Sequence, residues 1–484
     1  METVEKDVVI IGAGIAGLAT ALALKRLGIK PLVLEKSDGL RGTGAAINFA
    51  PNAWLALDAL GVSHKLASIY DPVKRLFVTN LRTGATQETS LAGKSENGSG
   101  IRYIHRKKLL ETLADELPND TIHFSSKIAA INSETHDALS PVIIHLADGT
   151  IVKAKVLIGC DGIHSTVARW LGLSEPLNAG RSAGLGLAVF PEGHGLNKEV
   201  RLFVDAGMRA GYVPLNDKEI YWFLVCNCSA EGENKAGNPE LIQKEVLEKY
   251  AKVLPPFYSV IVRRSDASTL HWAPLMFRHP WNVFFGNLSK GNVTVAGDAM
   301  HPMTPDLGQG GCQALEDAVV LGRHIGNLLI KTKGHIATTG DNNVAQAIDG
   351  YVKERKWRVT GLVIGSYLSG WVQDGGSNWW MRFLRDVIFY RFLVGGVLGN
   401  KVTGYDCVEG LKLENGRWKP ESFKIGFEWR GFGLQAADRW PRLMAGRTGF
   451  HLAADRGFTW ELAAADRGDA DGSRLVATSL GSNR

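Results

Sequence analysis

Three glycines near the start of the chain have the spacing of a dinucleotide-binding turn. Gly12, Gly14 and Gly17 form the pattern G-x-G-x-x-G directly after the β-branched run DVVII at 7–11. In such a turn the first glycine permits the tight bend, the second lets the backbone approach a pyrophosphate, and the third lets helix and strand pack closely. We therefore assign these glycines to the binding of nucleotide phosphates.

The segments that flank this turn supply the other groups that a dinucleotide needs. Apolar residues at helical spacing begin at Ile15 and Ala16, whose free N–H groups and partial positive charge favour phosphate. The next predicted strand, 30–35, ends at Glu35, which can accept both ribose hydroxyls of an adenosine, and Lys36 follows it at the same site. Because Glu35 would repel a 2′-phosphate, the sequence predicts FAD or NAD here, not NADP.

A second glycine-rich loop lies at 297–318, with the sequence GDAMHPMTPDLGQGGCQALEDA. Asp298 follows a buried strand and can accept a hydrogen bond from a sugar-like hydroxyl, and Pro305 stiffens the loop. The helix that follows points its positive end at a ligand, which stabilises the anionic N1/C2=O region of a reduced flavin. The backbone can approach a flat ring at three positions, Gly308, Gly310 and Gly311. We expect this loop to hold the ribityl chain and ring of the FAD whose ADP half lies on 12–17.

The loop at 297–318 resembles the G-D motif of the class A flavoprotein aromatic hydroxylases, the para-hydroxybenzoate hydroxylase type. CDGIHSTVARWLG at 160–172 resembles their D-G motif, which serves FAD and nicotinamide together and places Asp161 at the site. The stretch at 367–407, from YLSGWVQ to TGYDC, is similar to the plant branch of salicylate-hydroxylase-like and zeaxanthin-epoxidase-like monooxygenases. The family usually ends shortly after such a Tyr-Asp-Cys.

Two further segments carry the same resemblance. IHRKKLLETL at 104–113 resembles the segment whose arginine lies beside FAD, which is Arg106 here. LRGTGAAINFAPNAWLALDALGV at 40–62 resembles the stretch after the Rossmann strand, with Arg41 in the cofactor-side position. In all, the resemblance covers about residues 5–412.

The resemblance implies an FAD-dependent monooxygenase. In the family, FAD is reduced by NAD(P)H, reacts with O₂ and forms a C4a-hydroperoxide, which hydroxylates or epoxidises a small aromatic or apolar substrate. Since the cofactor carries the chemistry, we name no catalytic side chain and expect no metal. A flavin halogenase is disfavoured because no G-W-x-W-x-I-P segment is present. The alternative from another class is a flavin-bound redox sensor or scaffold without turnover.

Several side chains have a structural alternative to their functional interpretation. Asp161 also has the position of a helix N-cap, and Arg106 sits in a basic run that solvent can hydrate. His164 and His301 are expected to be structural. Alternation within the predicted strands nominates a substrate pocket, with plain core packing as the alternative for each candidate: Tyr212, Trp222, Phe223, Met276 and Phe277.

The order of predicted elements indicates an α/β fold. A Rossmann-type FAD-binding domain is interleaved with a mainly antiparallel β-sheet substrate domain, and a helical part follows. We place the FAD-binding domain at 5–180 and 285–345, the substrate domain at 181–284 and the helical region at 346–412. Residues 426–484, with eight Arg and no Lys, are expected to form a poorly ordered tail.

Composition limits the function further. A net charge of +6 over 484 residues gives no nucleic-acid signature. The five Cys have no framework spacing, which suggests reduced thiols. The first strand begins too early for a signal or transit peptide, so we expect a cytoplasmic protein.

No apolar run reaches about 18 residues, so we expect no transmembrane segment. Residues 362–372 and 386–399 are either domain-covering or interfacial helices, and the oligomeric state is open.

Overall fold

The computed structural model describes residues 3–42, 45–91, 100–133, 140–227, 237–331, 343–374, 400–408 and 411–420. All of them belong to one compact unit, Met1–Gly431. The predicted tail at 426–484 and the apolar stretch at 386–399 lie outside the described residues. Four of the five cysteines, Cys160, Cys226, Cys312 and Cys407, are buried free thiols, and Cys228 falls outside the description.

The first sheet contains the predicted βαβ opening. Its order is β16-β17-β10-β1-β2-β7, with β9 added to β10 and β8 to β9. The strands from β17 to β7 run parallel, as the Rossmann prediction requires. Their bounds are β1 (Thr3–Ile11), β2 (Leu32–Leu34), β7 (Ile122–His123), β8 (Ile128–Ser133), β9 (Val142–Leu146), β10 (Ile151–Gly159), β16 (Ser289–Lys290) and β17 (Val293–Val295).

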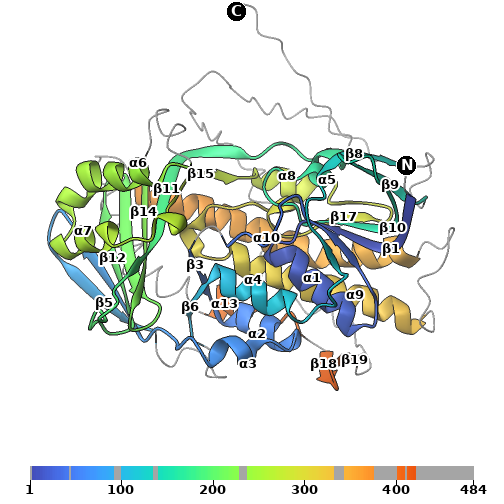
Figure 1. The fold of residues 1–484 in the computed structure, drawn as a ribbon, viewed down its shortest axis with the longest axis horizontal. Helices are drawn as coiled ribbons and strands as arrows, with labels where there is room; N and C mark the ends of the chain where they lie inside the picture. Colours follow the sequence, from blue (N-terminus) through green and yellow to red (C-terminus); the bar gives the residue numbers. More distant parts are fainter. Residues whose placement is uncertain are drawn as a thin grey trace, which may run out of the picture. The chain divides into compact units, whose positions relative to one another are not determined.

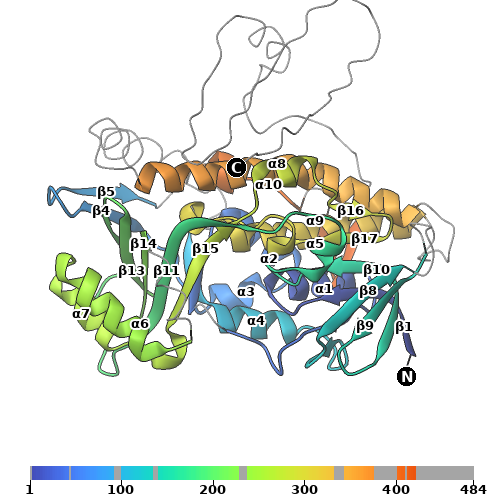
Figure 2. The ribbon, with the colours of Figure 1, turned by 90° about the horizontal axis from the view of Figure 1, so that it is seen from above.

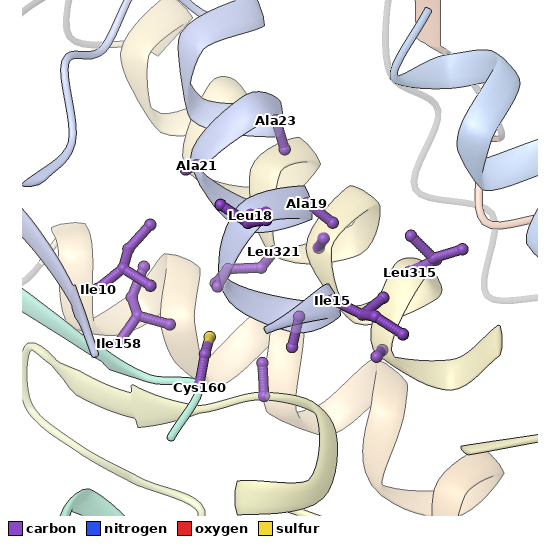
Figure 3. Packing of buried hydrophobic residues seen from close by; sticks show 14 of the residues in the cluster. Ile10, Ile15, Leu18, Ala19, Ala21, Ala23, Ile158, Cys160, Leu315 and Leu321 are labelled. Atoms are coloured by element: carbon purple, nitrogen blue, oxygen red, sulfur yellow. The ribbon is translucent and has the colours of Figure 1, made fainter. Parts of the chain in front are cut away.

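Helix α1 (Ile15–Arg26) lies between this sheet and α9 (Gly310–Lys331). Almost every residue of α1 is buried, because the helix is apolar all round and is covered on both sides. Figure 3 shows Ile10 and Ile158 of the sheet on one side of α1 and Leu315 of α9 on the other, and Leu321 of α9 belongs to the same core cluster. The two predicted cofactor motifs therefore share one hydrophobic core.

The second sheet is mainly antiparallel, as predicted. Its order is β15-β11-β14-β13-β12-β4-β5, and only the β12–β4 pair among these is parallel. The predicted range 181–284 leaves out β4 and β5. These two strands come earlier in the chain, before several strands of the first sheet. The bounds are β4 (Arg75–Asn80), β5 (Thr86–Ser90), β11 (Leu177–Val189), β12 (Glu199–Asp205), β13 (Met208–Pro214), β14 (Glu219–Asn227) and β15 (His271–Phe277).

One face of the second sheet is covered by the helices between β14 and β15 (Figure 1). The first of these helices, α6 (Pro239–Glu245), continues as a π-helical turn (Val246–Tyr250) and a 3₁₀ turn (Ala251–Val253). Helix α7 (Pro256–Arg263) follows. The Trp222 ring of β14 packs on Tyr258 of α7, 6.1 Å between centroids, so this face is filled by helix packing.

The remaining elements close the unit around the two sheets. The helices are α2 (Pro51–Ala59), α3 (Ser63–Ala67), α4 (Arg106–Ala114), α5 (Thr166–Trp170), α8 (Pro280–Phe285), α10 (Asn343–Asp374) and α13 (Asn400–Thr403). Two small antiparallel pairs are β3 (Ala46–Phe49) with β6 (Arg102–His105), and β18 (Leu411–Glu414) with β19 (Arg417–Pro420). Within the described ranges, none of the helices has the length and apolar character needed to cross a membrane.

Candidate functional site

The first glycine turn is packed so tightly that two of its glycines cannot carry a side chain. Gly12 has a φ of +99°, and a Cβ there would lie 2.5 Å from the carbonyl oxygen of Cys160. A Cβ on Gly17 would lie 1.8 Å from the carbonyl oxygen of Gly12. At Gly14, by contrast, an added Cβ meets no atom within 4 Å. The turn therefore presents open space at Gly14, where a pyrophosphate would approach the backbone.

Glu35 supports this turn from the end of β2. Its Oε2 accepts the N–H of Ala13 at 2.8 Å, and its Oε1 accepts the N–H of Ser37 at 2.9 Å. The Arg41 guanidinium lies 3.8 Å from Oε1. Lys36 is exposed beside it. The carboxylate is thus held at the carboxyl end of the central strands, the position where an adenosine ribose is bound in Rossmann folds.

The second loop begins with a turn that exposes one acidic side chain. Gly297 has a φ of +61°, and a Cβ there would lie 2.8 Å from Ala16 Cβ of the first motif. The two motifs are therefore in direct contact. Asp298 is exposed, whereas its neighbours Gly297 and Ala299 are buried. A carboxylate at this place is free to accept a hydrogen bond from a bound ligand.

Three predicted cofactor residues from separate segments come together here. Burial lowers the pKa of Arg106, the carboxylate of Asp298 opposes that shift, and the charge of Arg41 adds to it. Arg106 also donates its backbone N–H to the carbonyl oxygen of Ala45 at 3.1 Å. Its Nε is buried and has no hydrogen-bond partner among the described residues. A buried donor without a partner, next to an exposed carboxylate, is what a site for a polar ligand provides. It does not agree with the alternative interpretation, in which Arg106 is a hydrated surface residue.

The later glycines lie against β3. A Cβ on Gly308, whose φ is +62°, would lie 2.5 Å from Asn48 Nδ2, and one on Gly311 would lie 2.4 Å from Ile47 Cδ1. Gly310 opens α9 and has no atom within 4 Å of an added Cβ. Ile47 and Asn48 were not assigned from the sequence, although they fall within the segment that contains Arg41. These two residues can be assigned to the loop only once β3 is placed opposite it.

The loop is tied to the second sheet by a buried ion cluster that the sequence did not indicate. Arg181 of β11 donates to both oxygens of Asp306, at 2.9 and 2.8 Å, and Arg209 of β13 lies 3.2 Å from Oδ1. Asp306 follows Pro305 and its side chain is fully buried. Burial alone would raise the pKa of Asp306, but the two guanidinium groups outweigh it and lower the pKa.

Asp161 has a capping role in this structure. Its carboxylate accepts the N–H of Thr166 at 2.6 Å and that of Val167 at 3.4 Å at the start of α5, and the hydroxyl of Ser165 donates to it. The N-cap of α5 is Ser165, whose Oγ accepts the N–H of Ala168 at 2.8 Å, so Asp161 supports the first turn from outside the helix and is not itself the N-cap. Contact of Asp161 with FAD or nicotinamide stays a prediction. His301 is structural, as expected: it is buried and its Nε2 lies 2.6 Å from Asp317 Oδ2.

The strand register divides the pocket candidates between the two faces of the second sheet. Tyr212 pairs directly with Trp222, so both point to the helix-covered face, and their assignment to the pocket was wrong. Alternation predicts two faces, but it does not say which one the helices cover. Phe223 lies on the other face, which we call the inner face, with Tyr221, 6.1 Å between ring centroids. At the sheet edge, Phe277 packs on Tyr367 of α10, while Met276 is half-buried.

The inner face of the sheet meets the segments that carry the cofactor motifs. Leu185, Leu187 and Tyr221 pack there against Ala45 and Ala46, next to Arg106 and β3. Arg181 and Arg209 project from this same face to Asp306. Open backbone at Gly14 and Gly310, the exposed Asp298 and the orphaned Arg106 Nε together fit an extended dinucleotide.

The chain is similar to known proteins. The chain matches the family described as "FAD binding domain" over residues 5–363. It is 41% identical over 409 residues to Monooxygenase 2 of Arabidopsis thaliana, covering 83% of this chain and 97% of that relative. Monooxygenase 1 of the same plant is 38% identical over 371 residues, with 76% and 90% covered. HpxO of Klebsiella pneumoniae, solved in complex with FAD and uric acid, superposes with a TM-score of 0.68 at 27% identity, covering 81% of this chain and 96% of that chain.

Proposed function

Because this chain belongs to the family of FAD-dependent monooxygenases, we propose that it uses NAD(P)H and O₂ to hydroxylate or epoxidise a small aromatic or apolar substrate. For hydroxylation the balance is substrate–H, O₂, NAD(P)H and one proton giving substrate–OH, NAD(P)⁺ and water. The flavin, once bound, supplies the redox chemistry of both half-reactions. The side chains of this protein bind and orient the flavin and the substrate, and they exclude water.

The ion pairs between the second sheet and the glycine loop carry this proposal. Arg181 and Arg209 fix Asp306 against the inner face of the sheet, so the loop that would hold the flavin ring lies beside that face. A substrate between the two would be shielded from water on the sheet side by Leu185, Tyr221 and Phe223. Exclusion of water protects reactive oxygen-transfer chemistry from wasteful side reactions.

Two tyrosines next to the inner face of the sheet are suited to line the substrate pocket as uncharged hydrogen-bonding side chains. The rings of Tyr103 on β6 and Tyr221 on β14 lie 6.4 Å apart. Burial raises the pKa of Tyr103 to about 12, although the charge of Arg209 opposes the shift. Burial also raises the pKa of Tyr221. Both hydroxyls therefore stay protonated at neutral pH, where each can donate one hydrogen bond and accept others.

The test is to follow electrons and oxygen separately. Purified protein is mixed with NADH or NADPH without air, and flavin absorbance is recorded in the presence of a panel of small aromatic compounds. Compounds that accelerate reduction are then incubated in isotopically labelled O₂ and analysed by mass spectrometry. Labelled oxygen in the product supports the proposal. Flavin that is reduced but yields only peroxide with every compound would favour the redox sensor, and flavin that neither NADH nor NADPH reduces would overturn the proposal.

A further inference from the structure

Helices α8 and α10 lie side by side (Figure 2). Aromatic side chains of both helices gather at this surface. Trp281, Phe285 and Trp357 are 58%, 72% and 63% exposed. Trp281 stacks on Phe285 with 6.3 Å between centroids, and Phe284 lies edge-on to Phe285 at 4.9 Å and to Trp357 at 4.3 Å. We call these four rings the aromatic patch. A contiguous exposed apolar cluster marks an interaction surface, unlike single exposed apolar residues.

The outward side of α10 changes in character at Trp357. Before this residue, the outward positions are polar, with Gln346 and Lys353 both exposed, whereas a Cβ on Gly350 would lie 2.6 Å from His324 Nδ1 of α9. After it, the same side continues at spacings of three and four residues with apolar or small positions: Gly361, Ile364, Leu368 and Trp371. Residues at this spacing share one side of a helix. From Trp357 to Trp371 they form a stripe about 21 Å long at the usual helical rise, and the aromatic patch continues into it.

Cations lie at the margin of the aromatic patch. Lys356 places its Nζ 5.3 Å from the centre of the Phe284 ring, and Lys353 is exposed one turn before Trp357. The acidic side chain between them is neutralised within the protein, because Glu354 is bound by Arg323 and by His324 Nε2. The exposed Asp349, which accepts from Ser289 Oγ, lies one turn before Lys353 on the same side of α10, so this surface carries two lysines against one carboxylate that no cation inside the protein pairs with among the described residues.

We propose that the aromatic patch and the stripe after it dock on the surface of an anionic lipid bilayer. Tryptophan is enriched at the membrane–water interface, where its ring is apolar at one end and polar at the other. A helix with an apolar aromatic side and basic residues at its margin lies in the plane of that interface. Lys353 and Lys356 add attraction to acidic headgroups. Lipid thus matches both the rings and the sign of the charge.

The opposite side of the same half of α10 supports the glycine loop. Ser366 Oγ donates to the carbonyl oxygen of Thr304 at 2.9 Å, and a Cβ on Gly370 would lie 2.1 Å from a guanidinium nitrogen of Arg181. The bilayer would therefore lie directly behind the helix that holds the loop before α9. Docking itself needs neither flavin chemistry nor a substrate, so its test is independent of the proposed function.

The test is co-sedimentation of the full chain with vesicles of phosphatidylcholine alone and of phosphatidylcholine mixed with phosphatidylglycerol. The wild type should bind the mixed vesicles more strongly and lose part of that binding at high salt. The triple variant Trp281→Ser, Phe285→Ser, Trp357→Ser should lose roughly tenfold or more in partition coefficient, because three apolar rings no longer leave water. Lys353→Glu with Lys356→Glu should abolish the preference for acidic vesicles.

The matched control places three serines at exposed apolar positions elsewhere, Leu241, Val253 and Val260 on the helices of the second sheet. This variant should bind like the wild type. The proposal is overturned if the wild type does not bind mixed vesicles, or if the aromatic triple variant binds them equally. It is also overturned if the aromatic triple variant melts many degrees lower, since the rings would then be packed within the protein. A wild-type dimer that the triple substitution converts to a monomer, with vesicle binding unchanged, would assign the patch to a second copy.

Discussion

The carboxylate of Asp317 accepts the backbone N–H of Gly297 at 2.8 Å, so a residue of α9 fixes the turn that opens the loop before this helix. The same oxygen lies 2.6 Å from His301 Nε2, and the other accepts from Arg355 Nε at 2.7 Å. Burial alone would raise the pKa of Asp317, but His301 and Arg355 lower it strongly, so the group is ionised at neutral pH. Asp298, next to Gly297, therefore projects from a turn that Asp317 of α9 holds in place.

This arrangement separates the role of Asp298 from the stability of the loop. If Asp298 accepts a hydrogen bond from the ribityl chain, Asp298→Ala removes one charge-assisted hydrogen bond, which contributes roughly 1.5–3 kcal/mol. FAD should then bind on the order of ten- to a hundredfold more weakly. Asp298→Asn should cost less, because the amide oxygen still accepts. Titration of the apoprotein with FAD measures the dissociation constant of each variant.

The control for this variant is the melting temperature of the apoprotein. An exposed Asp298 that contacts only the ligand leaves that temperature unchanged on replacement. If the melting temperature falls equally with and without FAD while the dissociation constant stays constant, Asp298 caps the loop and does not contact the cofactor.

The glycine turn offers a matched pair of substitutions. Gly17→Ala introduces a Cβ 1.8 Å from the Gly12 carbonyl oxygen, so we expect the apoprotein itself to lose stability or fail to fold. Gly14→Ala meets no atom within 4 Å, so the melting temperature of the apoprotein should stay near that of the wild type. FAD affinity should nevertheless fall for Gly14→Ala, because the methyl group occupies the approach to the pyrophosphate. Unchanged FAD affinity in this variant would move the pyrophosphate away from Gly14.

Acid should weaken the contact between α9 and α10 through Glu354. Burial would raise the pKa of this carboxyl, but hydrogen bonding to His324, the charge of Arg323 and the Tyr405 hydroxyl lower it from 4.5 to about 2. Since the pKa is depressed in the folded protein, ionised Glu354 stabilises the fold above pH 4.5, and this contribution disappears as the pH falls toward 2. At neutral pH it amounts to roughly 3 kcal/mol.

The corresponding variant is Glu354→Gln, with the free energy of unfolding measured in urea on the apoprotein. At neutral pH the variant should be less stable than the wild type by the amount above. At about pH 3 the gap should shrink to half or less, because the wild type has begun to lose the same contribution. A gap that is constant from neutral pH to pH 3 would show that Glu354 acts through its hydrogen bonds and not through its charge.

Local spacing was enough to predict the strand–turn–helix segments that carry the candidate cofactor residues. The turn at Gly12, Gly14 and Gly17 and the loop at Asp298 and Gly310 each follow a strand and open a helix, and both features can be recognised in the sequence. Strand, turn and helix chemistry acts over a few residues, so these motifs carry their own context. The mixed α/β architecture follows from the same order of elements.

Partners that meet through tertiary packing were not predictable in this way. Asp306 lies in the recognised loop, but nothing near it in the sequence indicates Arg181 or Arg209, which two strands of the other sheet supply. The assignment of Trp222 to the pocket failed because period-two alternation is the same for both faces of a sheet. The face is decided by where α6 and α7 pack, and their own apolar residues do not specify this.

Arg209 is a side chain of the inner face with hydrogen-bonding capacity left for a substrate. Its guanidinium reaches Asp306 at 3.2 Å and donates to Gln373 Oε1, while its Nε is buried without a hydrogen-bond partner among the described residues. A buried donor that lacks a partner is costly, and a ligand that accepts from it regains that energy. The guanidinium also carries a charge next to the loop that would hold the flavin ring.

We therefore expect Arg209→Gln to raise the KM for any compound that stimulates NAD(P)H oxidation by roughly ten- to a hundredfold, the cost of one charge-assisted hydrogen bond. FAD content should stay that of the wild type, because Arg181 still binds Asp306 through both oxygens. Arg201→Gln is the matched control: Arg201 is paired with Tyr212 on the opposite face of the sheet, so its KM should not change. Steady-state kinetics and flavin absorbance give both quantities. If Arg209→Gln loses FAD while its KM stays constant, Arg209 supports the loop and does not contact the substrate.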